Sequence, residues 1–129
     1  MGDGTTRMTP DSKINGDGRS RTPSTERKAA EFLIDALSEV GVRHLFGVIG
    51  GSVVPLFTAT VGRRTQLIMA KHEAGAAFMA DGYARVSGGL GACIATSGPG
   101  ATNLITGVAS AYADSIPMIV LTGQVATKS

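Results

Sequence analysis

The sequence predicts an α/β domain built on a doubly wound parallel sheet. Short apolar runs alternate with segments of helical periodicity, and glycine-rich turns separate them, as in repeated strand and helix units. The runs at 92–95 and 118–121 carry no charged side chain, which suits strands covered on both faces. We therefore expect four parallel strands with helices on both faces, in a sheet that is incomplete toward the C-terminus.

The elements can be placed in order along the chain. The first helix is expected from residue 25 to residue 40, capped by Ser24 or Thr25 and ended by Gly41. Pro55 falls in the first turn of the second helix, where a missing N–H costs little. The expected strands are 44–49, 66–70, 91–96 and 117–122, and the expected later helices are 52–61, 72–86 and 101–113.

The first 24 residues differ from the rest of the chain. Their large apolar side chains are only Met1, Met8 and Ile14, too few to offset the entropy lost on ordering. We expect residues 1–24 to form a flexible tail and residues 25–129 to form one partial domain.

Composition excludes several classes of function. The net charge is +2, and several of the basic residues lie within the first 28 residues rather than on a recognisable binding element, so we expect no nucleic-acid partner. The apolar runs are too short to span a membrane, and the N-terminus lacks the apolar core of a secretory signal. The single Cys93 and the absence of a Cys/His cluster indicate a reducing, cytoplasmic location and no bound metal.

Three of the four turns that follow the strands have unusual content, at 48–52, 71–73 and 97–103. All of them are expected at the carboxyl edge of the sheet, where ligands bind in such folds. Position 103 is Asn where the dinucleotide fingerprint needs Gly, and neither glycine-rich turn ends as a P-loop does, so both nucleotide readings are excluded. A glycine-rich turn can also serve chain geometry alone.

Glu73 and His72 each allow a structural and a functional interpretation. Glu73 opens a helix, where a carboxylate complements the helix dipole without any catalytic role. His72 follows a strand, where a histidine is often a structural group. The small residues after Glu73 would let either another backbone or a ligand approach closely.

Taken together, these residues resemble the acetolactate synthase family of thiamine-diphosphate enzymes over residues 26–125. The resemblance rests on several spaced blocks in the same order, which are far more specific than any one of them. The blocks are FGVIGG at 46–51, KHEAGAA at 71–77, ADGYAR at 80–85, TSGPGATNL at 96–104, DSIP at 114–117 and LTGQ at 121–124.

The resemblance implies the N-terminal, pyrimidine-binding part of a carboligase of branched-chain amino acid biosynthesis. Such an enzyme decarboxylates pyruvate and joins the two-carbon unit to a second 2-keto acid. Glu73 would bond to, and exchange a proton with, ring nitrogen N1′ of the cofactor. This role needs a carboxyl that can be protonated near neutral pH, so we expect burial to raise the pKa of Glu73 against the pull of the helix N-terminus.

The resemblance also implies the other cofactor contacts. Gly50 and Gly51 would line the cofactor near its reacting carbon, where the absence of a side chain makes room. Pro99 and Asn103 would pack beside the pyrimidine, and Gln124 would be a further contact.

Two positions depart from the family pattern. Ile49 replaces the usual Pro before the paired glycines, which frees the backbone of that loop and puts its shape in doubt. Lys71 replaces the usual Arg before His-Glu, which keeps the charge but loses the planar donor fork.

The family binds the diphosphate and Mg²⁺ through a Gly-Asp-Gly motif followed further along by Asn, in a separate C-terminal domain. The Gly-Asp-Gly at 16–18 does not qualify, because it lies in the tail and residues 42–45 at the corresponding distance include no Asn. We assign no metal ligand. The resemblance implies that FAD is bound, if at all, only by the full-length enzyme. That enzyme would act as a homodimer or a larger homo-oligomer, and we expect this chain to be inactive alone.

Other interpretations stay open at this point. The chain could belong to another decarboxylase or acetyltransferase of the superfamily, such as sulfoacetaldehyde acetyltransferase, oxalyl-CoA decarboxylase or benzoylformate decarboxylase. It could be a non-catalytic cofactor-binding subunit that pairs with a separate diphosphate-binding chain. It could also be an inactive remnant.

Overall fold

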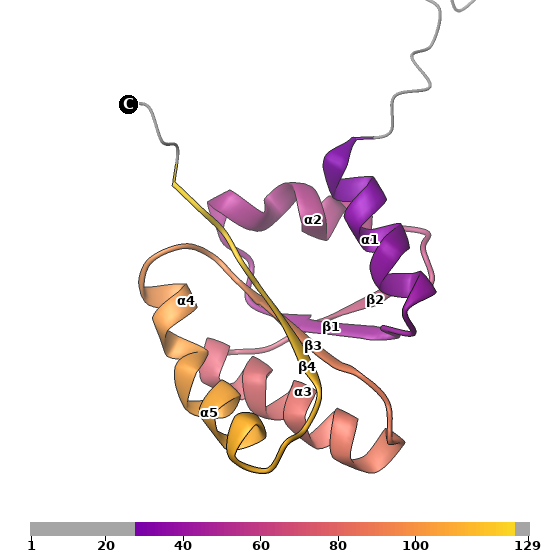
Figure 1. Cartoon of the computed structure of the whole chain (residues 1–129). Coiled ribbons are helices and arrows are strands. Elements are labelled where there is room, and N and C mark those ends of the chain that lie inside the picture. Colours follow the sequence, from indigo (N-terminus) through magenta and orange to yellow (C-terminus); the bar gives the residue numbers. More distant parts are fainter. Residues whose placement is uncertain (1–27, 126–129) are drawn as a thin grey trace, which may run out of the picture.

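The computed structural model describes residues 28–125 (Figure 1). The expected tail at 1–24 and the expected caps Ser24 and Thr25 lie outside the described residues. The elements are α1 (Ala29–Glu39), β1 (His44–Gly47), the 3₁₀ turn η1 (Gly51–Val53), α2 (Val54–Ala59), β2 (Gln66–Met69), α3 (Glu73–Ser87), β3 (Gly91–Ala95), α4 (Pro99–Asn103), α5 (Ile105–Ala113) and β4 (Met118–Thr122).

The four strands form one parallel sheet in the order β2-β1-β3-β4. Helices α1 and α2 cover one face, and α3, α4 and α5 lie on the other (Figure 1), so the predicted doubly wound α/β class is confirmed. The chain runs from β1 outward to β2 and then crosses to β3 on the other side of β1. The topological switch point therefore lies between β1 and β3, where ligands bind in open α/β sheets.

The central strand β3 is buried over its whole length, as the apolar run at 92–95 predicted. One buried cluster lies under α1 and α2, and a second lies between the sheet and α3. The prediction that the run at 118–121 is likewise covered on both faces is wrong for the described residues. Strand β4 is an edge strand whose residues are all partly or fully exposed, because no further strand among residues 28–125 lies outside it.

The expected helix at 101–113 is also wrong in its bounds. Helix α4 begins two residues earlier, at Pro99, because Gly98 takes φ 66° and ψ −126° and turns the chain directly from β3 into a helix. Helices α4 and α5 meet at Leu104, whose N–H bonds to the carbonyl of Ala101 in a tightened turn. The remaining elements were predicted in type and order, with ends shifted by up to a few residues.

Small residues bring α3 close to its neighbours. Ala76, Ala77 and Ala80 are fully buried on the face of α3 toward the sheet and α5. A Cβ placed on Gly107 of α5 would lie 2.5 Å from the Ala77 Cβ and 3.0 Å from the backbone nitrogen of Phe78. Gly91 at the start of β3 likewise has no room for a side chain beside Ala80. Another backbone, rather than a ligand, occupies this side of α3.

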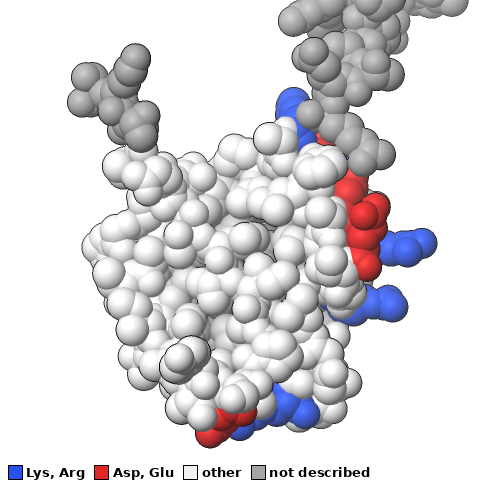
Figure 2. Space-filling view, in the orientation of Figure 1, with Lys and Arg blue, Asp and Glu red and all other residues white. Residues whose placement is uncertain are grey.

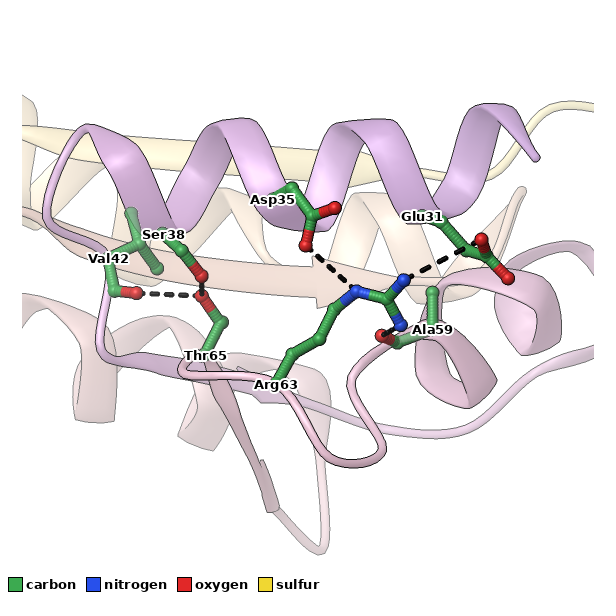
Figure 3. Close-up of polar contacts among 7 residues, drawn as sticks. All are labelled: Glu31, Asp35, Ser38, Val42, Ala59, Arg63 and Thr65. Atoms are coloured by element: carbon green, nitrogen blue, oxygen red, sulfur yellow. Dashed lines mark hydrogen bonds and ion pairs between the residues drawn. The ribbon is translucent and has the colours of Figure 1, made fainter. Parts of the chain in front are cut away.

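Arg63 ties α1 to the turn after α2 (Figure 3). Its Nε donates to Asp35 Oδ1 at 2.8 Å, its Nη1 donates to the Ala59 carbonyl at 2.8 Å, and its Nη2 lies 3.6 Å from Glu31 Oε2. Nearby, the buried Thr65 hydroxyl donates to the Val42 carbonyl at 2.8 Å. These contacts fix α1 against the segment that leads into β2.

Arg85 ties α3 to the turn before β4. Its Nε donates to Asp81 Oδ1 at 2.9 Å and its Nη2 to Asp114 Oδ2 at 2.7 Å, and these two bonds raise the pKa of Arg85.

Cys93 is buried in β3, and desolvation raises the pKa of its thiol to about 12, so the thiol stays protonated. No helix within residues 28–125 combines the length and apolar character needed to cross a membrane.

The close approach of α3 and α5 makes a testable prediction. Gly107→Ala should lower the free energy of unfolding by about 1–3 kcal/mol, because its methyl group meets Ala77 and the backbone of Phe78. Gly82→Ala is the matched control, since nothing lies within 4 Å of its added Cβ. The control should gain up to about 1 kcal/mol from helix propensity. Denaturant unfolding measures both, and a Gly107→Ala variant as stable as the parent would contradict the packing.

Candidate functional site

The carboxyl ends of the strands lie at one edge of the sheet. Gly47 of β1 is in register with Met69 of β2 and Ile94 of β3, and Ala95 is in register with Thr122 of β4. The turns that follow the strands therefore gather at this edge, as the sequence predicted. They include the two loops that flank the switch point, after β1 and after β3.

Glu73 and Asn103 meet at this edge. Glu73 is the first residue of α3 and is half-buried, and Asn103 is the last residue of α4. The Asn103 Nδ2 donates to Glu73 Oε2 at 3.1 Å. A Cβ on Gly100, one turn earlier in α4, would lie 3.4 Å from Glu73 Oε1. Two residues that were predicted separately as cofactor contacts are thus in direct contact.

The expected rise in the pKa of Glu73 is wrong for the described residues. A hydrogen bond from its own backbone N–H lowers the pKa most, the Asn103 amide lowers it further, and His72 adds a smaller effect in the same direction. Desolvation raises the pKa but is outweighed, because the carboxyl lies at a helix start and is only half-buried. Within this chain Glu73 is an ionised carboxylate at neutral pH.

His72 has the structural role that was one of its two interpretations. It is the N-cap of α3, and its Nδ1 accepts a hydrogen bond from the backbone N–H of Ala74 at 3.1 Å. This contact satisfies one of the free N–H groups at the helix start. It also fixes the first turn of the helix that carries Glu73.

The paired glycines after β1 have different surroundings. A Cβ on Gly50 would collide with the side chain of Thr96, so the room expected at Gly50 is already filled by the loop after β3. Nothing lies within 4 Å of a Cβ on Gly51, whose backbone faces open space. Of these two glycines, Gly51 is the one that leaves room for a ligand.

Ser52 and Thr96 hold the two switch-point loops together, and sequence reasoning assigned no role to either. The Ser52 hydroxyl lies 2.9 Å from Thr96 Oγ1 and accepts a hydrogen bond from the backbone N–H of Ser97 at 3.2 Å. Gly123, directly after β4, packs against Ser52 with no room for a side chain. A hydroxyl after paired glycines was the available signal, but it does not distinguish a loop contact from a helix cap.

The other predicted site residues lie on the same edge with exposed side chains. Pro99 is the first residue of α4, and Gln124 follows β4. Ile49 and Lys71, the two departures from the family pattern, are also exposed. The loop that contains Ile49 is anchored next to it through the contact of Gly50 with Thr96.

These features define a parallel α/β domain with a carboxyl group and bare backbone at the switch-point edge of its sheet. Residues 27–129 match the family model described as "Thiamine pyrophosphate enzyme, N-terminal TPP binding domain". The chain belongs to this family.

Individual relatives support the same assignment. The chain is 54% identical over 101 residues to a probable acetolactate synthase large subunit of Methanocaldococcus jannaschii, covering 78% of this chain and 17% of the relative. It is 50% identical over 96 residues to the acetolactate synthase isozyme 2 large subunit of Escherichia coli, covering 74% and 18%. It is 45% identical over 109 residues to a probable chloroplastic acetolactate synthase 2 of rice, covering 82% and 16%. The chain therefore spans less than a fifth of the length of these relatives.

The residues at the edge fit one end of thiamine diphosphate. Its aminopyrimidine has a ring nitrogen that can bond to a carboxyl group, and Glu73 is a carboxyl at this edge. The open space at Gly51 leaves room for a flat ring. The diphosphate end calls for a hard cation held by oxygen ligands. Within residues 28–125, no group of three His, Cys, Asp or Glu side chains could hold a metal ion.

The different surroundings of Gly50 and Gly51 can be tested by experiment. Gly50→Ala should lower the free energy of unfolding by about 1–3 kcal/mol, because its methyl group displaces Thr96 and the loop after β3. Gly51→Ala should leave the free energy of unfolding within about 0.5 kcal/mol of the parent, because its methyl group enters open space. Denaturant unfolding of both variants is the measurement. Equal effects would show that the loop is not anchored on Thr96.

Proposed function

We propose that this chain supplies the pyrimidine-binding half of the active site of an acetolactate synthase. In this proposal the complete protein decarboxylates pyruvate and joins the two-carbon unit to a second 2-keto acid. The observation that carries the proposal is the Glu73 carboxyl, held by Asn103 at the switch-point edge of a domain of this family. The acetolactate synthase names of the relatives favour this reaction over those of other superfamily members.

Glu73 is proposed to bond to ring nitrogen N1′ of the aminopyrimidine and to pass a proton to and from it. Bound thiamine diphosphate supplies a carbon that adds to the keto group and takes up the electrons released by decarboxylation. Gly51 is proposed to line the ring, with Pro99 and Gln124 at the rim of the site. Gly50 contributes by keeping the loop after β1 against Thr96.

The ionised state of Glu73 in this chain is compatible with the proposal. Protein that covers the edge would remove water from the carboxyl and raise its pKa, because desolvation penalises the charged form. The helix start and Asn103 would oppose that rise. Their balance would keep the carboxyl able both to lose and to gain a proton near neutral pH.

The rest of the active site is proposed to lie outside these residues. Mg²⁺ and the diphosphate would be bound by a separate domain, and FAD, if the complete enzyme uses it, would bind elsewhere. The greater length of the relatives supports further domains. The single, buried Cys93 supports a cytoplasmic location.

We also propose that the complete protein is a homodimer or a larger homo-oligomer. A broad face around β4, α4 and α5 is free of charge, with Lys, Arg, Asp and Glu confined to its margins (Figure 2). Residues 86–113 contain none of these four residue types. Ile105, Tyr112 and Val120 line a hollow of about 340 Å³ on this face. An apolar, uncharged face of this kind supports contact with further protein.

Replacing the proposed catalytic carboxyl tests the function. In the complete protein, Glu73→Gln should lower kcat for acetolactate formation from pyruvate by about 100-fold or more, because an amide cannot exchange the proton. Saturating thiamine diphosphate and Mg²⁺ separate this loss from weaker cofactor binding. The control is Glu39→Gln, an exposed acid at the end of α1, which should keep the parental rate. Parental activity in Glu73→Gln would refute the proposal.

A further inference from the structure

The contact between Asn103 and Glu73 joins two elements that are far apart in sequence. Asn103 Nδ2 lies 3.1 Å from Glu73 Oε2, and both side chains are half-buried. Glu73 belongs to α3, which follows β2, whereas Asn103 belongs to α4, which follows β3. The contact therefore depends on where α4 begins and in which direction it runs.

The loop after β3 sets that direction. Gly98 has φ 66° and ψ −126°, a backbone conformation that side-chain-bearing residues rarely adopt. Pro99 starts the helix immediately afterwards, and the backbone N–H of Thr102 bonds to the Gly98 carbonyl at 3.1 Å. Asn103 consequently lies less than two turns into the helix, on the side that faces α3.

Gly100 leaves space for the carboxyl group. A Cβ at this position would lie 2.7 Å from Thr96 Cγ2 and 3.4 Å from Glu73 Oε1. Gly100 and Asn103 are three residues apart and so share one face of a helix. That face offers a gap beside one carboxyl oxygen and an amide donor to the other.

We infer that Asn103 is a positioning residue, which orients the Glu73 carboxyl for the bound pyrimidine rather than acting mainly by packing against the ring. Its catalytic consequence rests on the function proposed above. An amide suits this task because it carries both a donor and an acceptor, so it can pair with a carboxylate or, after reorientation, with a protonated carboxyl. A cationic side chain at this position would favour only the ionised form.

Few charged groups surround Glu73, so the effect of Asn103 on the pKa of its carboxyl can be measured separately from the effect of neighbouring charges. Helix α4 and the loops 48–51 and 96–98 contain no titratable side chain. His72, the N-cap residue directly before Glu73, is the neighbouring group whose charge lowers the pKa of the carboxyl. A change at Asn103 therefore alters one hydrogen bond to Glu73 and leaves the neighbouring charge in place.

The test is a titration of Glu73 in the 129-residue chain by carbon-13 NMR of its carboxyl resonance, which is assigned by its loss in Glu73→Gln. Asn103→Ala should raise the titration midpoint, because a donor to the carboxylate is lost. Asn103→Asp should raise it more, because two carboxyl groups in contact resist joint ionisation. Thr106→Ala, an exposed polar residue on α5, is the control and should leave the midpoint unchanged.

Several results would overturn the inference. They are an unchanged midpoint in Asn103→Ala, an unchanged midpoint in Asn103→Asp, and an equal shift in the Thr106→Ala control. If Asn103→Ala does not fold, Asn103→Ser replaces it, since a serine hydroxyl is too short to reach Glu73 in the same way. A two-dimensional amide spectrum that matches the parent verifies the fold of each variant.

The complete protein supplies the second readout. Asn103→Ala should lower kcat for acetolactate formation about tenfold, as expected for the loss of one orienting hydrogen bond, with little change in the KM for pyruvate. A change in KM alone would overturn the positioning role. Failure of this inference is distinguishable from failure of the proposed function, because the latter is decided by Glu73→Gln and does not depend on Asn103.

Discussion

The close packing of α3 against β3 and α5 is the constraint on which the candidate site depends. Alanines on α3 and glycines at 91 and 107 let three backbones approach to distances that no larger side chain would allow. Helix α3 carries Glu73 at its first residue, and α4 lies between β3 and α5. The packing therefore fixes both ends of the contact between Glu73 and Asn103.

The protonation state of the Glu73 carboxyl is decided by opposing effects on its pKa at the start of α3. The helix N-terminus and the Asn103 amide favour a carboxylate, and burial opposes them. In the described residues the first two effects prevail, since the edge of the sheet is partly open. In the proposed function, further protein that covers the carboxyl would raise its pKa and so suit it to proton exchange.

Much of the fold could be predicted from the sequence because local signals and the fold agree. The apolar run 92–95 predicted a buried strand, Gly41 marked the end of α1 and Pro55 marked the first turn of α2. The edge position of β4 agrees with the incomplete sheet expected from the sequence, whereas the place of β1 between β2 and β3 could not be predicted, because strand order depends on which strands pair. The early start of α4 depends on the unusual backbone of Gly98, which the expected helix bounds did not anticipate. The site edge was predicted from topology, whereas the roles of Gly50 and Ser52 required the position of Thr96.

The most direct measurement is a crystal structure of the complete protein with thiamine diphosphate bound. We expect the Glu73 carboxyl to lie within hydrogen-bond distance of pyrimidine N1′, about 2.6–3.2 Å, with Asn103 still bonded to that carboxyl. A pyrimidine bound away from the β1 and β3 loops, or one whose N1′ is bonded by another residue, would contradict it.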